Sequence, residues 1–402
     1  MSTPALFSAM PITRFPPPPA AGERYRLARS ACGLLLIALA GCSGIDESTD
    51  QTAASGKRPW SSLDKPTLQQ RVTALLPRQL KNRQDWAADL ITAYDHLQIR
   101  ASPENFCATV AVIAQESGFQ VDPPVAGLPK IVQGELERRA ERLGLPKAVV
   151  LAALQLESPN GQTYQQRIDA LRTEKHLSAL YEDIVAYVPL GERWLADYNP
   201  VRTAGPMQVS IRFAEQRVSE KGYPYAAEGS IRAEVFSRRG GVYFGSAILL
   251  DYPAPYTEMR YRFADFNAGR YASRNAAFQK TLASLTGQPL VADGDLLRYE
   301  NGQAAGGRSA VETALRQLSV DLRLSSREIR RDLLAEKTAE FAETDLYQNL
   351  YRLAEARGIK ARRQTMPEIT LQSPKITRQL TTEWFANRVD QRYKACLKRA
   401  VQ

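Results

Sequence analysis

Three short segments carry the residue types best suited to chemistry. The acid segment, Gln115–Phe119, places the carboxylic acid of Glu116 at the end of a predicted helix. The methionine turn, Gly205–Gln208, combines a glycine, a thioether and an amide, and the asparagine segment, Asp265–Gly269, contains an aromatic ring and an asparagine. A carboxylic acid can act as a general acid, and amides and aromatic rings are suited to holding sugars. An acid, an amide and an aromatic ring are what the protonation of a glycosidic oxygen inside a sugar groove requires.

Glu116 is the residue that we expect to carry this chemistry. The last turn of a helix presents the negative end of the helix dipole, and Phe119 adds apolar surface nearby. Both features disfavour a carboxylate, so the acid should keep its proton near neutral pH, as a general acid must. Glu157 stands in a similar local string but lacks the Gly-Phe continuation. We interpret Glu157 as a surface charge before a turn.

In this order the three segments resemble the signature of the lysozyme-like lytic transglycosylases, which cut the glycan strands of peptidoglycan. The resemblance implies that Glu116 protonates the oxygen between MurNAc and GlcNAc, then takes a proton from the muramoyl C6 hydroxyl and gives a 1,6-anhydro product. It implies peptidoglycan as the partner and no cofactor. The residues that it assigns to substrate binding are Ser117, Gly205, Met207, Gln208, Phe266 and Asn267.

The chain departs from that family at three points. Pro206 stands where the family has leucine, and Phe266 where it has tyrosine. The interval between the first two segments is also far longer, so we interpret residues 120–198 as an insertion that shapes one wall of the groove. The whole chain resembles an uncharacterised family of proteobacterial lipoproteins as well, through the strings at residues 202–208 and 274–279.

Two other functions fit the same residues. The first is a lipid-anchored protein of cell-wall assembly that binds peptidoglycan without turnover. The second is a hydrolytic muramidase, which would need a second acid. Candidates for that acid are Asp197, Glu215 and Asp265. The only histidines, His96 and His176, have no metal-ligand spacing, so we expect no metal centre and place both at surface or capping positions.

The N-terminus predicts export. Arg24, Arg26 and Arg29 precede the apolar run Leu34–Leu39, and the run ends in Leu-Ala-Gly-Cys at Cys42. A basic stretch, a short apolar core and small residues before a cleavage site are typical of a secretory signal. The ending resembles a bacterial lipobox, which implies a signal peptide over residues 1–41, a lipid on Cys42 and a location on the outer membrane facing the periplasm. The alternative is ordinary signal cleavage with Cys42 incidental.

The formal net charge of +10 suits a polyanionic mesh such as peptidoglycan, and no basic run interleaved with aromatics suggests nucleic acid. In an oxidising compartment we predict a disulfide between the remaining cysteines, Cys107 and Cys396, which would tie the C-terminal helix to the helix that carries Glu116. The alternative is two separate buried thiols, because sequence does not give their distance.

The hydrophobic periodicity predicts a mainly α-helical protein. Residues 42–59 read as a flexible tether, 60–300 as a lysozyme-like catalytic domain, and 301–402 as a region of additional helices. Ser102-Pro103-Glu104 marks a helix start before Glu116, and Ser325 with Glu328 forms a capping box. Further helices are expected after Ala310, near residues 345–356 and over 381–397.

Overall fold

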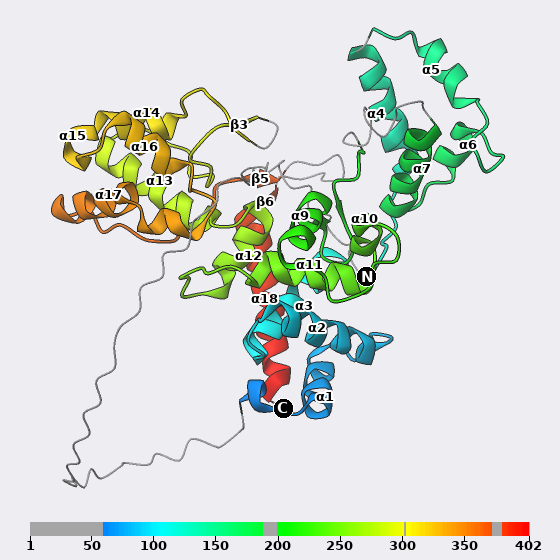
Figure 1. The fold of residues 1–402 in the computed structure, drawn as a ribbon, viewed down its shortest axis with the longest axis horizontal. Helices are drawn as coiled ribbons and strands as arrows, with labels where there is room; N and C mark the ends of the chain where they lie inside the picture. The colour runs from blue at the N-terminus through cyan, green and yellow to red at the C-terminus, as the bar shows by residue number, and fades with distance from the viewer. Residues whose placement is uncertain (1–58, 143, 188–198, 301–302, 372–379, 402) are drawn as a thin grey trace, which may run out of the picture.

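The computed structural model describes residues 59–142, 144–187, 199–300, 303–371 and 380–401. The predicted signal peptide, Cys42 and Asp197 lie outside these residues. As predicted, the fold is mainly helical, and the strands that are described form three two-residue hairpins. No helix in the described part of the chain combines the length and apolar character needed to cross a membrane. Figure 1 shows three groups of helices.

The main body is built from both ends of the chain. Its elements are η1 (Trp60–Ser62), α1 (Lys65–Leu75), α2 (Arg83–Leu97), α3 (Pro103–Glu116), α9 (Ile211–Lys221), α10 (Ile231–Val235), α11 (Arg238–Leu250), α12 (Met259–Ala268) and α18 (Thr382–Val401). In Figure 1 the last of these, α18, runs through the body beside α3 and α12. One hydrophobic cluster joins residues from three ranges of the sequence, 60–119, 201–266 and 371–396. Its members include Ile113, Met207, Phe266 and Phe385.

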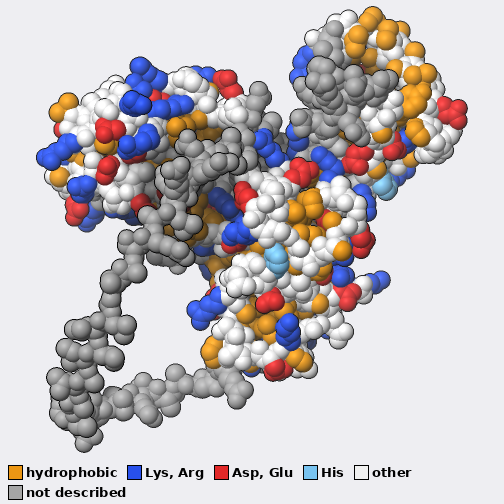
Figure 2. All heavy atoms as spheres, viewed as in Figure 1, with side chains coloured by type: hydrophobic (Ala, Val, Ile, Leu, Met, Phe, Trp, Pro, Cys, Tyr) orange, Lys and Arg blue, Asp and Glu red, His pale blue; other side chains and the backbone are white. Residues whose placement is uncertain are grey.

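The insertion lobe contains α4 (Leu128–Arg142), α5 (Lys147–Leu154), α6 (Tyr164–Asp169) and α7 (Glu174–Tyr187). It has a small hydrophobic cluster of its own, centred on Leu128, Tyr164 and Leu180. The start of the lobe pairs with the segment between α6 and α7, because Val125 donates its backbone N–H to the Arg172 carbonyl and Pro124 bridges Thr173. Helix α5 buries none of its residues, and apolar side chains are visible on this lobe in Figure 2.

The C-terminal lobe contains α13 (Ala272–Thr286), α14 (Ala310–Gln317), α15 (Ser319–Leu322), α16 (Ser326–Leu333), η3 (Ala339–Glu343) and α17 (Asp345–Ala356), with the hairpin of β3 (Tyr299–Glu300) and β4 (Gln303–Ala304). Its hydrophobic cluster runs from Phe278 to Ala354. The predicted capping box of α16 is present, since Ser325 and Glu328 satisfy each other's backbone N–H groups. A further hairpin, β5 (Thr370–Leu371) with β6 (Leu380–Thr381), leads back to the main body.

The hydrophobic clusters divide the chain differently from the sequence-based ranges. The change from the main cluster to the C-terminal one lies between α12 and α13, rather than at residue 300. The range 301–402 is not one unit either, because α18 packs in the main body. Periodicity identifies a helix and its apolar face, but it does not say which other helix that face meets.

Candidate active site

Glu116 is the last residue of α3, and the sequence explains why the helix begins and ends where it does. At its start the Ser102 side chain accepts a hydrogen bond from the Asn105 backbone N–H, and Pro103 occupies the first helical position. At its end Gly118 adopts a left-handed φ of 60° and returns its N–H to the Ile113 carbonyl. Glu116 therefore ends a helix whose apolar side chains pack in the main cluster, and it is only 1% exposed.

Phe119 closes the acid segment against α2. It takes a left-handed φ of 69°, and its ring meets the edge of Trp86 at a centroid distance of 5.3 Å. Ser117 is buried as well and donates its hydroxyl to the Ile113 carbonyl. Both residues are thus packed inside the protein, and Ser117 hydrogen-bonds to the protein backbone.

The methionine turn is the tip of a hairpin between β1 (Thr203–Ala204) and β2 (Val209–Ser210). Gly205 has a φ of 74°, and a Cβ atom there would lie 2.1 Å from the carbonyl oxygen of Val235. The position therefore requires glycine, for both backbone conformation and space. The backbone N–H of Gln208 closes the turn by donating to the Gly205 carbonyl at 3.0 Å.

The methionine turn packs against glycine residues of helix α11. A Cβ atom at Gly241 would lie 2.3 Å from Pro206 Cδ, and one at Gly245 would lie 2.2 Å from Met207 Sδ. Met207 is fully buried, and Gln208 is buried with its side-chain oxygen accepting from the Thr203 hydroxyl at 3.2 Å. The prediction gave Met207 a sugar-facing role, whereas the structure gives it a packing role that anchors the hairpin.

The asparagine segment ends α12, and its side chains are buried. Phe266 lies in the main hydrophobic cluster, so its ring packs inside the protein rather than forming an open wall. The Asp265 carboxylate accepts hydrogen bonds from the hydroxyls of Tyr252 and Tyr256 and from the backbone amides of Tyr271 and Ser273. Asp265 therefore holds the turn between α12 and α13, which argues against it as the second acid of a muramidase.

Helix α18 connects the acid and asparagine segments. The sequence predicted this helix and its disulfide to α3, but not its polar contacts with the two segments. Its first residue, Thr382, donates its hydroxyl to the side-chain oxygen of Asn267 at 2.8 Å. Arg392 donates Nε–H to the side-chain oxygen of Gln115, the neighbour of Glu116, at 3.0 Å. One helix thus fixes both segments. Thr382 and Arg392 do not stand in any sequence motif, so the sequence could not identify these contacts.

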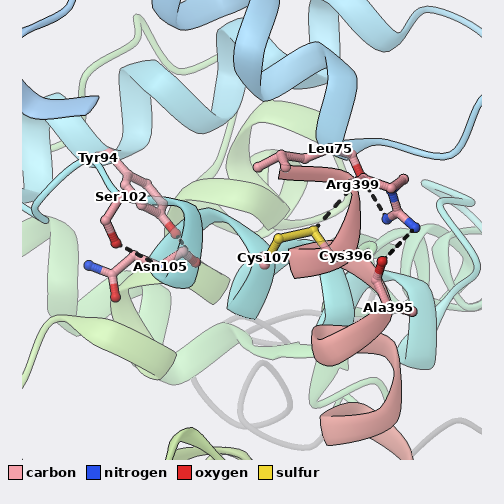
Figure 3. Close-up of a disulfide and its surroundings, with 8 residues drawn as sticks. All are labelled: Leu75, Tyr94, Ser102, Asn105, Cys107, Ala395, Cys396 and Arg399. Carbon is pink, nitrogen blue, oxygen red and sulfur yellow. Dashed lines mark hydrogen bonds between the residues drawn. A yellow bond between two sulfur atoms is a disulfide. The ribbon is translucent and has the colours of Figure 1, made fainter. Parts of the chain in front are cut away.

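A disulfide locks α18 to α3. Cys107 and Cys396 are bonded with a Cα–Cα distance of 5.5 Å, the pairing that the sequence allowed (Figure 3). Arg399, one turn further along α18, donates to the Leu75 carbonyl at the end of α1 (Figure 3). The helix that ends in Glu116 is therefore held covalently at one position and by Arg392 near its end.

The remaining candidates lie elsewhere. Glu215 is on the exposed side of α9, and Glu157 is exposed in the insertion lobe, as predicted. His96 and His176 are exposed too, and His96 contacts the Tyr243 hydroxyl through Nδ1 at 3.1 Å. Within the described ranges no cluster of three His, Cys, Asp or Glu side chains could hold a metal ion.

The structure thus assembles the three segments on one body. Phe119, Met207 and Phe266 share the main hydrophobic cluster. The polar side chains predicted to touch sugar, Gln208 and Asn267, are buried and hydrogen-bonded to Thr203 and Thr382. Their observed contacts are with protein, so in this conformation they fix the methionine turn and the end of α12.

Comparison with known proteins identifies the family. Residues 79–399 match the family model described as "Protein of unknown function (DUF1615)". The chain belongs to the DUF1615 family. It is also similar to "Uncharacterized protein YaiW" of Escherichia coli (strain K12), with 46% identity over 366 residues that cover 91% of this chain and 96% of that protein. No solved structure matches the chain.

Proposed function

We propose that the protein is an envelope lipoprotein that cleaves peptidoglycan strands between MurNAc and GlcNAc as a lytic transglycosylase. The observation that carries this proposal is the buried carboxyl of Glu116 at the end of α3, with Gln115 and Asn267 both held by α18. A carboxyl group removed from water favours its protonated form, which is the form a general acid needs.

The proposed reaction uses this single carboxyl group twice. Glu116 gives its proton to the glycosidic oxygen as the bond from that oxygen to C1 of MurNAc breaks. The muramoyl C6 oxygen then bonds to C1, and its proton passes to the Glu116 carboxylate. The new bond forms a 1,6-anhydro bridge on MurNAc. Glu116 regains its proton without a second carboxylate or a water molecule. The use of Asp265 in structural hydrogen bonds favours this route over hydrolysis.

The second candidate function is a lipoprotein that binds peptidoglycan without cutting it. The burial of Glu116 and Asn267 favours it, because a sugar cannot reach either side chain in this conformation. Phe266 also lacks the hydroxyl that the related tyrosine would offer to the acid. Transglycosylation requires the covering side chains to move when a glycan strand enters.

Digestion of purified sacculi separates the candidates. The full chain, purified in detergent, is incubated with sacculi, and the released muropeptides are analysed by mass spectrometry. Release of 1,6-anhydro ends supports the transglycosylase, and release of reducing ends supports a muramidase. Retention of the protein on sacculi with no release supports the binding protein.

A further inference from the structure

A charged cavity of about 400 Å³ lies between the insertion lobe and the main body. Its wall comes from four separate parts of the chain: Asp89 of α2, Lys175 of α7, Glu228 before α10, and Glu234, Arg238 and Arg239 around the start of α11. Three of these side chains are cationic and three are acidic. The volume falls in the range of small-molecule sites.

Glu234 and Arg239 form an ion pair in the wall of the cavity. Glu234 receives two hydrogen bonds from Arg239, one from the Tyr223 hydroxyl and one from the Glu228 backbone N–H. Burial alone would raise the pKa of Glu234, but these hydrogen bonds and the Arg239 charge outweigh it and hold the pKa at about 2. Glu234 and Arg239 use their hydrogen-bonding groups on each other. They therefore shape the cavity rather than contact a ligand.

The other charged groups keep unused hydrogen-bonding capacity. Arg238 donates Nε–H to Asp89 Oδ2 at 2.5 Å and Nη1–H to Asp85 at 3.3 Å, which leaves its Nη2 donors. The second carboxylate oxygen of Asp89 accepts no hydrogen bond from the side chains in the described part of the chain. Lys175 is exposed and makes no hydrogen bond or ion pair with any residue that the structure describes. The Glu228 side chain is 84% exposed and reaches Arg239 at 3.1 Å with one oxygen.

Side-chain and backbone contacts connect the cavity wall to two of the three segments of the candidate active site. The Arg238 guanidinium lies 5.9 Å from the centre of the Trp86 ring, and Trp86 packs on Phe119 of the acid segment. On another side, Gly205 of the methionine turn packs on the Val235 carbonyl, next to Glu234. The cavity is thus one layer of contacts away from the acid segment, through Trp86, and from the methionine turn, through Val235.

The charge pattern selects the ligand. Lys175 and Arg238 suit a carboxylate, while Asp89 and Glu228 suit an ammonium group and would repel a ligand that carries only negative charge. We propose that this cavity binds the amphoteric end of a peptidoglycan stem peptide, with a carboxylate at Lys175 and Arg238 and an ammonium group at Asp89 and Glu228. The choice of a stem peptide rests on the proposed function, because the glycan strand is what carries such peptides.

Titration calorimetry tests this assignment with a defined probe. The full chain in detergent is titrated with the tripeptide L-alanyl-γ-D-glutamyl-meso-diaminopimelate, with the same peptide after acetylation of its amines, and with inorganic phosphate. We expect saturable binding of the free tripeptide only. Lys175→Glu should weaken it about tenfold or more, since a charge-assisted hydrogen bond is replaced by repulsion. Lys130→Glu, at an exposed lysine of α4 in the same lobe, should leave the affinity unchanged.

The assignment is overturned if the wild-type protein shows no saturable binding of the tripeptide. It is overturned equally if Lys175→Glu binds like Lys130→Glu, or if the acetylated peptide binds like the free one. Thermal unfolding of both variants verifies that they are folded. Release of anhydro ends from sacculi without tripeptide binding removes the cavity assignment alone, whereas tripeptide binding without any release supports the cavity and removes the proposed cleavage.

Discussion

The hydroxyl of Thr382 donates a 2.8 Å hydrogen bond to the side-chain oxygen of Asn267, across a sequence separation of 115 residues. Both groups are buried, and the bond joins the start of α18 to the end of α12. Thr382→Val keeps the shape and removes the donor, which should lower the free energy of unfolding by about 1–3 kcal/mol and shift Asn267. We expect Thr382→Ser to behave like the wild type. Equal unfolding midpoints in denaturant for the two variants would show that the bond has no role in positioning.

The disulfide between Cys107 and Cys396 should stabilise the main body. It closes a sequence separation of 289 residues, and both sulfur atoms are buried. Replacing both cysteines by serine should lower the free energy of unfolding by about 2–5 kcal/mol, mainly because the unfolded chain is no longer constrained. Denaturant unfolding with and without dithiothreitol measures this loss. The wild type should respond to the reductant and the double variant should not; a wild-type midpoint that ignores the reductant contradicts the prediction.

Gly245 should be intolerant of even one methyl group. A Cβ atom there overlaps Met207 Sδ, so Gly245→Ala must displace the methionine turn or bend α11. The expected cost is about 1–3 kcal/mol of stability. Gly134→Ala provides the matched control, since the nearest atom to its Cβ would be the end of the Arg138 side chain at 3.7 Å. Alanine in that helix should be neutral or stabilising by up to about 1 kcal/mol, and a similar loss in both variants would refute the packing argument.

The stability of the C-terminal lobe should fall as pH rises. Burial raises the pKa of Glu336 to about 7 from its ordinary value of 4.5, even though Tyr299 and the backbone amides of Leu296 and Leu297 donate to its carboxyl group. A raised folded-state pKa means that the folded protein holds this proton more tightly than the unfolded chain. The stabilising contribution is therefore complete below about pH 4.5 and is lost as pH rises through about 7.

Glu336→Gln cannot ionise and should lack this loss. Relative to the variant, the free energy of unfolding of the wild type should fall by about 3 kcal/mol between pH 4.5 and pH 8. Glu343→Gln, at an exposed position of the same lobe, should leave the wild-type pH profile in place. Parallel profiles for wild type and Glu336→Gln would mean that Glu336 ionises equally in both states.

Local sequence signals predicted the local structure well. Ser102 with Pro103 marked the start of α3, Ser325 with Glu328 marked α16, and the helix expected over residues 345–356 has those bounds in α17. Each of these signals acts within one or two turns of the chain. Backbone hydrogen bonds and caps are decided at that distance, which is why sequence alone could identify them.

Long-range relationships could not be predicted in the same way. The predicted disulfide indicated that α18 returns to α3, but nothing in the residues around Thr382 or Arg392 indicates that they hold Asn267 and Gln115. Residue type also did not determine exposure: Met207 and Phe266 suited a sugar surface by their chemistry, yet the glycines of α11 and the main cluster take them into the interior. The charged cavity escaped notice because its residues come from four parts of the chain.

The central claim is that Glu116 supplies the proton for glycan cleavage, and a matched pair of variants tests it most directly. Glu116→Gln keeps the size of the side chain and removes its acid, while Glu157→Gln makes the same change in a similar local string at an exposed site. The rate at which 1,6-anhydro muropeptides are released from sacculi should fall by about 10²–10⁴-fold in Glu116→Gln and stay at the wild-type rate in Glu157→Gln. Release by Glu116→Gln at the wild-type rate would contradict the account.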